Sequence, residues 1–505
     1  MPAESAIVFH LGRGDVTPSD VIAFADGRYR AMLDPSAEYV ERIERGANLA
    51  QQRAQQGGAT DPKLWAATDG HGADAQMQLR QSLTRYHGCG LGGTFSDREV
   101  AAVVAARAAS LGRGFSGVRH ELLLLLCEML NLRMFPRIPR RGAAGANADL
   151  VPLSYVAGAI AGDGDVSYLG RVVPAADGFA AAGLEMMELR PHEALALMSG
   201  TGMMTALGCV AWDRARHFAR FASALAAMAM DVVGASVEHL DPRLDALKPH
   251  PGMRAASEWL REDMEYGRGD TARDGRPATQ MLRGAGHVIG VQLDAVEFVH
   301  RVLEIELNAV SGGPIVHPAS GECIAGANFY GGEVTHALDG LKSSLFTCAA
   351  YVERLLALVC ESATNGGLPQ DLAGNVSGAT HGFHGMRGAA AGVIAEMATL
   401  AAPSALHARL AARDGSELAS MGTHAARDCL EMLELAESVA AMTALGVCQA
   451  AELRDAGGLR RRSKSVYRAV RQLVPHLRAD RAQDRDITSV LELFRAGLLP
   501  VGNER

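Results

Sequence analysis

The chain has 505 residues, of which 48% are hydrophobic and only 5% aromatic, and its formal net charge is −8. This length and apolar content suffice for a large core divided into two or three sub-regions. The negative charge gives no reason to expect nucleic acid or an anionic membrane as a partner.

Helix-start signals appear early in the chain. Thr17 precedes a proline and can cap a helix that begins there. Ser96 and Glu99 form a predicted capping box ahead of a helix over 100–111. Residues 120–133 continue as a helix, and the consecutive leucines at 122–126 predict that it is buried nearly all round.

Long helical patterns dominate the rest of the chain. They cover 190–235, 284–312, 330–363, 382–402 and 424–453. Strand signals are sparse and predict two short hairpins, at 166–173 and 315–324. Polar breaks at 264–277 and 364–380 are predicted to be active-site or interface loops. After residue 453 the chain becomes basic, which favours a solvated terminal helix.

The eight cysteines occur singly, mostly within apolar helical stretches. They predict reduced, buried thiols in a cytoplasmic protein. The N-terminus has no basic region followed by an apolar one, so we expect no signal peptide. Charges interrupt the most apolar runs, so we expect no membrane span. His381 and His384 share a helical face, but the sequence offers no third ligand and predicts no metal site.

One segment resembles the cofactor loop of a known enzyme family. Residues 145–153 read GANADLVPL, against GASGDLAPL in the aromatic amino-acid ammonia-lyases, which act on histidine, phenylalanine or tyrosine. In that family the Ala-Ser-Gly triplet cyclises to an electrophilic methylidene-imidazolone, abbreviated MIO.

Further matches occur in family order and with family spacing, over roughly residues 15–450. The segments here are RGFSGVR at 113–119, FPRIP at 135–139, LALMSGT at 195–201, LNAVS at 307–311 followed by Pro314, and GANFY at 326–330. They resemble the family patterns S-R-G-x-S-G-[IV]-R, [VY]-P-x-[IV]-P, L-A-L-[LI]-N-G-T, N-[AS]-[VT]-[ST]-D-N-P and G-G-N-F-H.

The resemblance implies an all-α fold of the fumarase/aspartase-like type. It implies an N-terminal mixed region at 1–190 that carries the inner loop and the degenerate MIO loop. A central helical bundle at 191–453 and a C-terminal helical tail at 454–505 would follow. It also implies a homotetramer whose active sites each draw residues from three subunits. Periodicity alone supports only a large helical protein.

The cofactor triplet itself is altered to Ala146-Asn147-Ala148. Formation of MIO requires a residue that can lose its β-substituent, as serine does by losing water. Asparagine carries a carbon there and cannot. Asn147 is most simply a turn residue that tolerates a left-handed backbone. We therefore expect that MIO is absent and that no other cofactor is bound.

Other family site positions also differ. Trp65 stands where the family has the catalytic Tyr of its inner loop, Ser199 where it has the Asn that supports the MIO carbonyl, Gln280 where it has a second Tyr, and Gly313 where it has the Asn of D-N-P. Two polar residues are kept: Arg283 at the substrate-carboxylate position and His87 at a substrate-side-chain position, and Phe329 is a further candidate for substrate binding.

Each candidate residue has a structural interpretation beside the functional one. Arg283 stands among apolar residues, so we expect it to be buried against either an internal acid or a substrate carboxylate. His87 is either a satisfied structural histidine or a substrate contact. Trp65 either packs within its loop or forms an aromatic wall for a cationic group. Tyr330 and Glu417 are candidate catalytic bases, with Glu333 a further candidate.

The missing electrophile restricts the chemistry. Ammonia elimination from an ordinary amino acid loses its main activation without MIO, whereas a trimethylammonium group departs as a neutral amine without it. Ergothionase, an MIO-free branch of this superfamily, splits the betaine ergothioneine in this way. We therefore predict an MIO-independent carbon–nitrogen lyase that acts on an aromatic or imidazole amino-acid derivative, with ergothioneine or a similar betaine as the favoured substrate. The alternative is a catalytically inactive homologue that serves as a binding or assembly partner.

Overall fold

The fold is described by a computed structural model over residues 6–55, 82, 84–143, 149–267, 278–313, 315–374, 380–408 and 419–502. The chain forms two compact units, each assembled from three separate stretches of sequence. Unit 1 comprises Met1–Asp213, Val299–Asp339 and Pro403–Arg427, and unit 2 comprises Arg214–Phe298, Gly340–Ala402 and Asp428–Arg505. The division into three consecutive regions stays a prediction.

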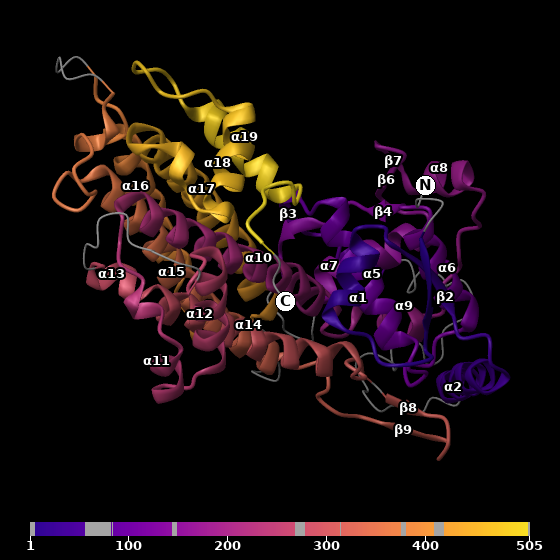
Figure 1. Ribbon diagram of the computed structural model, residues 1–505. Helices are drawn as coiled ribbons and strands as arrows, with labels where there is room; N and C mark the ends of the chain where they lie inside the picture. Colours follow the sequence, from indigo (N-terminus) through magenta and orange to yellow (C-terminus); the bar gives the residue numbers. More distant parts are fainter. Residues whose placement is uncertain are drawn as a thin grey trace. The chain divides into compact units, whose positions relative to one another are not determined.

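The long helices predicted from periodicity are present. They are α10 (Gly202–Val233), α14 (Ala285–Leu307), α15 (Gly332–Cys360), α16 (His384–Leu400) and α17 (Gly422–Arg454). The boundaries between the units fall within α10, α14, α15 and α17, so the chain passes from one unit to the other along continuous helices. Figure 1 shows these helices in the magenta to yellow part of the chain.

Unit 1 begins with a strand–helix–strand element. Strands β1 (Ile7–Leu11) and β2 (Tyr29–Leu33) pair in parallel, and α1 (Pro18–Ala25) connects them. The predicted helix start is confirmed, because Thr17 and Asp20 form a capping box. Sequence analysis missed both strands. Each has only five residues, and β1 is largely exposed, so neither shows a clear apolar run.

The central helix of unit 1 is α5 (Asp97–Leu111). Its capping box is confirmed, and every residue from position 99 to 111 is buried. It packs against α1, α6 (His120–Asn131) and α9 (Pro191–Met198). The expectation that α6 is buried all round is wrong, because Leu124 is 44% exposed. Consecutive leucines on a helix point in all directions, so one of them faces outward when neighbours cover only part of the surface.

The remaining elements of unit 1 are short helices and strands. They are α2 (Ala37–Gln55), β3 (Leu91–Thr94), β4 (Phe135–Pro136), β5 (Pro139–Arg141), α7 (Leu150–Ile160), β6 (Asp165–Tyr168), β7 (Arg171–Pro174), α8 (Ala175–Ala182), β8 (Ile315–His317), β9 (Glu322–Ile324) and the 3-10 helix η4 (Ser404–His407). Both predicted hairpins are confirmed, as β6–β7 and β8–β9. Helix α2 lies beside β8 (Figure 1).

Unit 2 is helical throughout its described part. Besides its share of the long helices it contains η2 (Glu238–Leu240), α11 (Pro242–Leu247), α12 (Pro251–Asp263), α13 (Gln280–Arg283), η3 (Gln370–Leu372), η5 (Ala456–Gly458), α18 (Arg461–Leu473) and α19 (Asp484–Arg495). Helices α15 and α17 approach closely at Gly446, where a side chain would overlap Leu356. Small residues therefore set the spacing of these helices.

Two segments are long and apolar enough to cross a membrane by length and composition alone, His192–Val233 and Gly332–Cys360. Their most apolar windows are 100% and 67% buried inside the protein. Core helices of this kind pass the same test as membrane spans, so the finding fits buried core helices.

A buried ion pair connects three helices of unit 2. Asp263 at the end of α12 accepts two hydrogen bonds of 2.8 Å from Arg220 on α10, and Arg462 on α18 donates a third at 3.0 Å. The side chains of Arg220 and Asp263 are 1% and 0% exposed. The backbone at Gly502 packs directly on the Arg220 guanidinium, where a side chain would overlap it.

The basic stretch after residue 453 was expected to be a solvated helix, and this expectation is wrong for two of its arginines. Arg462 pairs with Asp263, and Arg460 pairs with the buried Asp231 at 2.6 Å. Their charges compensate aspartates that lie about two hundred residues earlier in the chain. The terminal helices are thus part of the core of unit 2.

Removal of one partner of a buried pair should destabilise unit 2 strongly. Asp263→Asn removes the carboxylate that the buried Arg220 binds, and we expect a loss of about 3–5 kcal/mol in the free energy of unfolding. The matched control is Glu41→Gln, which breaks the exposed Arg45–Glu41 pair and should cost at most about 0.5 kcal/mol. Urea unfolding followed by circular dichroism measures both. Equal losses in the free energy of unfolding for the two variants would contradict the role assigned to Asp263.

Candidate functional site

A buried carboxylate marks the end of the degenerate cofactor loop. Asp149 caps α7 and is fully buried. Its carboxylate accepts a hydrogen bond of 3.0 Å from the Met204 amide and another from the Thr423 hydroxyl. Its own amide donates to the Gly200 carbonyl at 3.2 Å. One side chain therefore joins the starts of α7, α10 and α17 within unit 1. The triplet Ala146, Asn147 and Ala148 lies outside the described residues.

A cation lies in the same part of the core. Arg107 on α5 is 1% exposed. Its Nη2 donates to the carbonyls of Ala196 and Ser199, the latter at 2.6 Å. Burial lowers the pKa of Arg107 to about 10, and the attraction of Asp149 opposes this shift. Burial also raises the pKa of Asp149 to about 6, against the effect of its hydrogen bonds and of Arg107. The attraction between Arg107 and Asp149 therefore offsets only part of the pKa shift that burial causes in each group.

Ser199 is buried at the end of α9, where its carbonyl is taken up by Arg107. Thr201, two residues later, donates its hydroxyl to the carboxylate of Glu306. The turn between α9 and α10 thus connects the buried cation to an acid at the end of α14.

That acid lines a cavity in unit 1 with a volume of about 640 Å³. The cavity is formed by the end of α14, the 326–330 segment and the start of α15. Its lining residues are Val302, Ile305, Glu306, Ala309, Val310, Ala327, Asn328, Phe329, Tyr330 and Glu333. A mostly apolar pocket with a few convergent polar groups is the usual form of a small-molecule site.

The pKa of Glu306 depends on its burial and on its neighbours in this cavity. Burial raises the pKa of Glu306, and the negative charge of Glu333 raises it further, while the hydrogen bond from Thr201 lowers it. Glu306 therefore holds a proton more tightly than an ordinary glutamate. Sequence analysis missed Glu306, although it lies two residues before Asn308 of a recognised motif.

The aromatic residues of the cavity pack against two glycines, and the side-chain amide of Asn328 anchors the segment that carries them. The ring of Tyr330 packs on Gly332, where a side chain would overlap it, and Tyr330 is 38% exposed. Phe329 lies beside Gly313. Asn328 donates to the Val310 carbonyl at 3.2 Å, which joins the 326–330 segment to the 308–313 segment.

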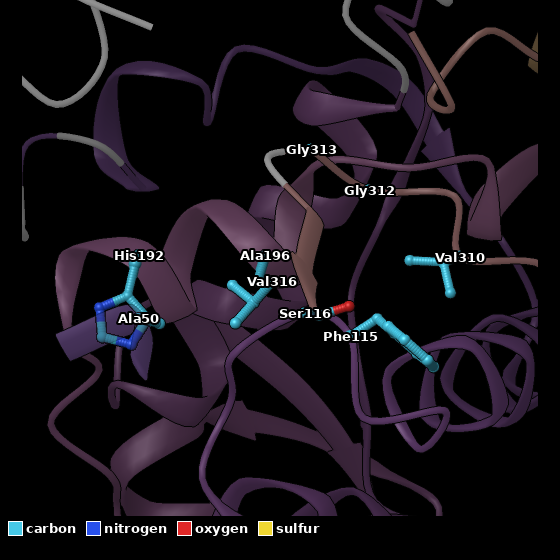
Figure 2. Close-up of a pocket in the computed structure, with 9 residues that line it drawn as sticks. All are labelled: Ala50, Phe115, Ser116, His192, Ala196, Val310, Gly312, Gly313 and Val316. Atoms are coloured by element: carbon cyan, nitrogen blue, oxygen red, sulfur yellow. The ribbon is translucent and has the colours of Figure 1, made fainter. Parts of the chain in front are cut away.

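A second, much smaller cavity lies next to the 308–313 segment. Figure 2 shows Val310, Gly312 and Gly313 on one side of it, with Ser116 and Phe115 nearby and His192 farther along. Its volume is about 20 Å³, which is room for roughly one water molecule. Burial lowers the pKa of His192 to about 4, so this histidine is neutral near pH 7. The cavity is too small for an amino acid.

Of the predicted site residues that the structure describes, Phe329, Tyr330 and Glu333 line one cavity. Ser199 lies next to Arg107. His87 is half-buried, with its ring 3.9 Å from that of Tyr86. Trp65 and Glu417 lie outside the described residues.

Gln280 and Arg283 belong to unit 2, on the single-turn helix α13, and both are exposed. The expectation that Arg283 is buried is wrong. Only Leu282 of this short helix faces the core, so the apolar residues around Arg283 in the sequence do not enclose its side chain.

Comparison with known proteins agrees with this architecture. The sequence profile of the family described as aromatic amino acid lyase matches residues 16–472. The histidine ammonia-lyase of Aromatoleum aromaticum is 34% identical, over 98% of this chain and 94% of the relative. That of Gloeobacter violaceus is 32% identical, over 95% of this chain and 94% of the relative.

Solved structures of similar proteins share the fold. The tyrosine aminomutase of Streptomyces globisporus superposes with a TM-score of 0.89 at 28% identity, and each chain is 98% covered. The histidine ammonia-lyase of Trypanosoma cruzi gives a TM-score of 0.87 at 25% identity, over 98% of this chain and 94% of the other. An ergothionase from Treponema denticola gives 0.89 at 21% identity, over 97% and 99%, which shows the fold alone. The all-α, fumarase/aspartase-like expectation is confirmed, and the chain belongs to the aromatic amino acid lyase family.

Proposed function

We propose that this chain is a carbon–nitrogen lyase that works without MIO. The family is one of carbon–nitrogen lyases, but the residues present do not fit its cofactor. Asn147 cannot yield the exocyclic methylidene, and Ser199 stands in place of the asparagine that supports the MIO carbonyl. The carbonyl of Ser199 is instead bound by Arg107. No step of the proposed reaction passes through MIO.

We infer the class of substrate from the residues that line the 640 Å³ cavity. It combines two carboxylates, Glu306 and Glu333, with the aromatic side chains of Phe329 and Tyr330. Carboxylates attract a cation, and aromatic faces bind quaternary ammonium groups by about 0.5–2 kcal/mol each. We infer a substrate with a trimethylammonium group, such as the betaine ergothioneine. A protein of the same fold, from Treponema denticola, is an ergothioneine degrading enzyme.

The proposed elimination balances without an external activator. A base removes a proton from Cβ, the electron pair of that bond forms the Cα=Cβ double bond, and the C–N bond breaks. Trimethylamine leaves as a neutral molecule because the nitrogen was already cationic. Glu306 and Tyr330 are the groups of the cavity that we assign to proton removal. The raised pKa of Glu306 makes it a stronger acceptor than an ordinary carboxylate.

We further propose that the complete site forms in a homotetramer. Among the described residues that line the cavity there is no basic side chain for the substrate carboxylate, and Arg283 is exposed in unit 2. Helix α14 also exposes apolar side chains at seven-residue intervals, Val291, Phe298 and Ile305, which are 55%, 39% and 72% exposed. This spacing suits packing against another helix. Arg283 of one subunit would then hold the carboxylate of a substrate bound to another, with Gln280, His87 and Trp65 as further contacts.

The alternative function is a catalytically inactive homologue that binds or assembles with other proteins. The joint change of Trp65, Ser199, Gln280 and Gly313 favours it, because decay of catalysis also removes several site residues together. The retained Arg283 and the acid-lined cavity favour an enzyme.

The altered triplet predicts that the chain carries no covalent modification at residues 146–148. The intact mass of the purified protein should equal that of the unmodified chain, because Asn147 cannot cyclise to MIO. Electrospray mass spectrometry measures this. A deficit equal to two water molecules would contradict it.

The substrate class is tested by incubation with ergothioneine and with histidine betaine. We expect release of trimethylamine and growth of the ultraviolet absorption of a conjugated acrylate. Arg283→Met should weaken binding of either betaine by about 1.5–3 kcal/mol, because it removes a charged hydrogen-bond donor. Plain histidine is the control and should release no ammonia. If a correctly assembled protein releases trimethylamine from neither betaine, the inactive homologue is the better description.

The base is tested by the pH dependence of kcat. Glu306 must be ionised to accept a proton, so activity should fall as the pH drops through its raised pKa, above the ordinary value of 4.5. Glu306→Gln should lower kcat about 10²- to 10⁴-fold. Glu333→Gln is the control. It removes a neighbouring negative charge that raises the pKa of Glu306, so the fall in kcat at acidic pH should move to lower pH. If Glu306→Gln keeps full activity and Tyr330→Phe loses it, Tyr330 is the base that removes the proton.

A further inference from the structure

The hydroxyl of Thr201 makes the one hydrogen bond that the Glu306 carboxylate accepts within the described residues. Thr201 lies in the turn between α9 and α10 and is 1% exposed. Glu306 lies in the last turn of α14 and lines the 640 Å³ cavity. Thr201 is not among the described residues that line this cavity, so it can act on a bound substrate only through Glu306.

Contacts on three sides hold Thr201 in place. Its amide donates to the Ser311 hydroxyl at 3.4 Å, and its carbonyl accepts from both the amide and the hydroxyl of Thr205, at 2.9 and 2.8 Å. Its methyl group lies against Gly331, where an added Cβ atom would be 3.1 Å from Thr201 Cγ2. A β-branched side chain has few rotamers even without such contacts. The hydroxyl therefore has a fixed place, and its hydrogen bond holds the Glu306 carboxylate as well.

The other surroundings of Glu306 oppose its negative charge. Burial raises the pKa of Glu306, and the charge of Glu333 at the start of α15 raises it further. The C-terminal end of a helix, where Glu306 lies, also disfavours a negative charge, because backbone carbonyls point there. Among the described residues that line the cavity, Tyr330 is the remaining titratable group. The hydrogen bond from Thr201 is the contact that favours the ionised carboxylate, which is the form that can accept a proton.

We propose that Thr201 is a positioning residue of the lyase, because its hydroxyl fixes Oε1 of Glu306 and leaves Oε2 to take the proton from Cβ of the substrate. This inference rests on the proposed function, in which Glu306 is the base. When the proton moves to Oε2, the electron pair of the C–H bond forms the Cα=Cβ double bond, and trimethylamine leaves with the electron pair of the C–N bond. Thr201 stays bonded to Oε1, so Glu306 keeps its orientation during this step.

The test follows the protonation of Glu306 directly. Infrared spectra of the full chain are recorded from acidic to alkaline pH, and the carboxyl C=O band of Glu306 is the one that is lost in Glu306→Gln. Thr201→Val keeps the shape of the side chain and removes the hydroxyl, so the midpoint of this band should rise by about one to two pH units. Thr201→Ala also removes the hydroxyl and should raise the midpoint too. Thr201→Ser keeps the hydroxyl and should keep the wild-type midpoint.

Thr205→Val is the matched control. Thr205 is buried one turn further along α10, and its hydroxyl donates to the Thr201 carbonyl and not to Glu306. This variant also loses a buried hydroxyl, but it should keep the wild-type infrared midpoint. With ergothioneine as substrate, the fall in kcat at acidic pH should move to higher pH in Thr201→Val and should stay in place in Thr205→Val.

Three outcomes would overturn the proposal. One is an infrared midpoint that is the same in wild type, Thr201→Val and Thr201→Ala. Another is an unchanged pH dependence of kcat in Thr201→Val, because Glu306 would then not accept the proton. The third is an equal shift in Thr205→Val, because the loss of any buried hydroxyl would then suffice. The infrared midpoint does not depend on turnover. If it shifts as expected but the wild-type protein releases no trimethylamine, Thr201 does control Glu306, and it is the lyase activity that fails.

Discussion

The anchoring of Asp149 is the interaction on which the candidate site of unit 1 depends. A single fully buried carboxylate accepts hydrogen bonds from α10 and α17, and its residue occupies the N-cap position of α7. These hydrogen bonds favour the charged form, because burial raises the pKa of Asp149, which stays at about 6 even with the hydrogen bonds and Arg107 lowering it. The same interaction fixes the turn between α9 and α10, whose Ser199 and Thr201 contact Arg107 and Glu306. Asp149 and Arg107 also attract each other in this part of the core.

The proposed function keeps the framework of the family and changes its chemistry. Asp149 directly follows the altered triplet Ala146-Asn147-Ala148 in the sequence and lies buried with Arg107 in the core of unit 1. In the described part of unit 1, the cavity beside this framework has acidic and aromatic walls. Such walls favour a substrate that brings its own positive charge. A cationic leaving group needs no electrophile, so the predicted absence of MIO and the composition of the cavity lead to the same proposal.

Buried charge also organises unit 2. Arg220, Asp263 and Arg462 join three helices, and the backbone at Gly502 covers the pair. Ion pairs of this kind contribute little net stability compared with apolar packing, but each is costly to break. They tie the terminal helices to the core and so explain arginines that a sequence pattern would assign to solvent.

The sequence by itself determined the all-α class, the family and most helix positions, because these depend on neighbours along the chain. Capping boxes at Thr17 and Ser96 and apolar periodicity over tens of residues are local signals. The chemistry of position 147 also needs no structure. Tertiary structure alone decided that Arg283 is exposed, that Glu306 joins Phe329 and Tyr330 in one cavity, and that Thr201 donates to Glu306. Those facts depend on which residues meet after folding, as when Thr423 donates to Asp149 across 274 positions. Neither helical periodicity nor a short motif contains that information.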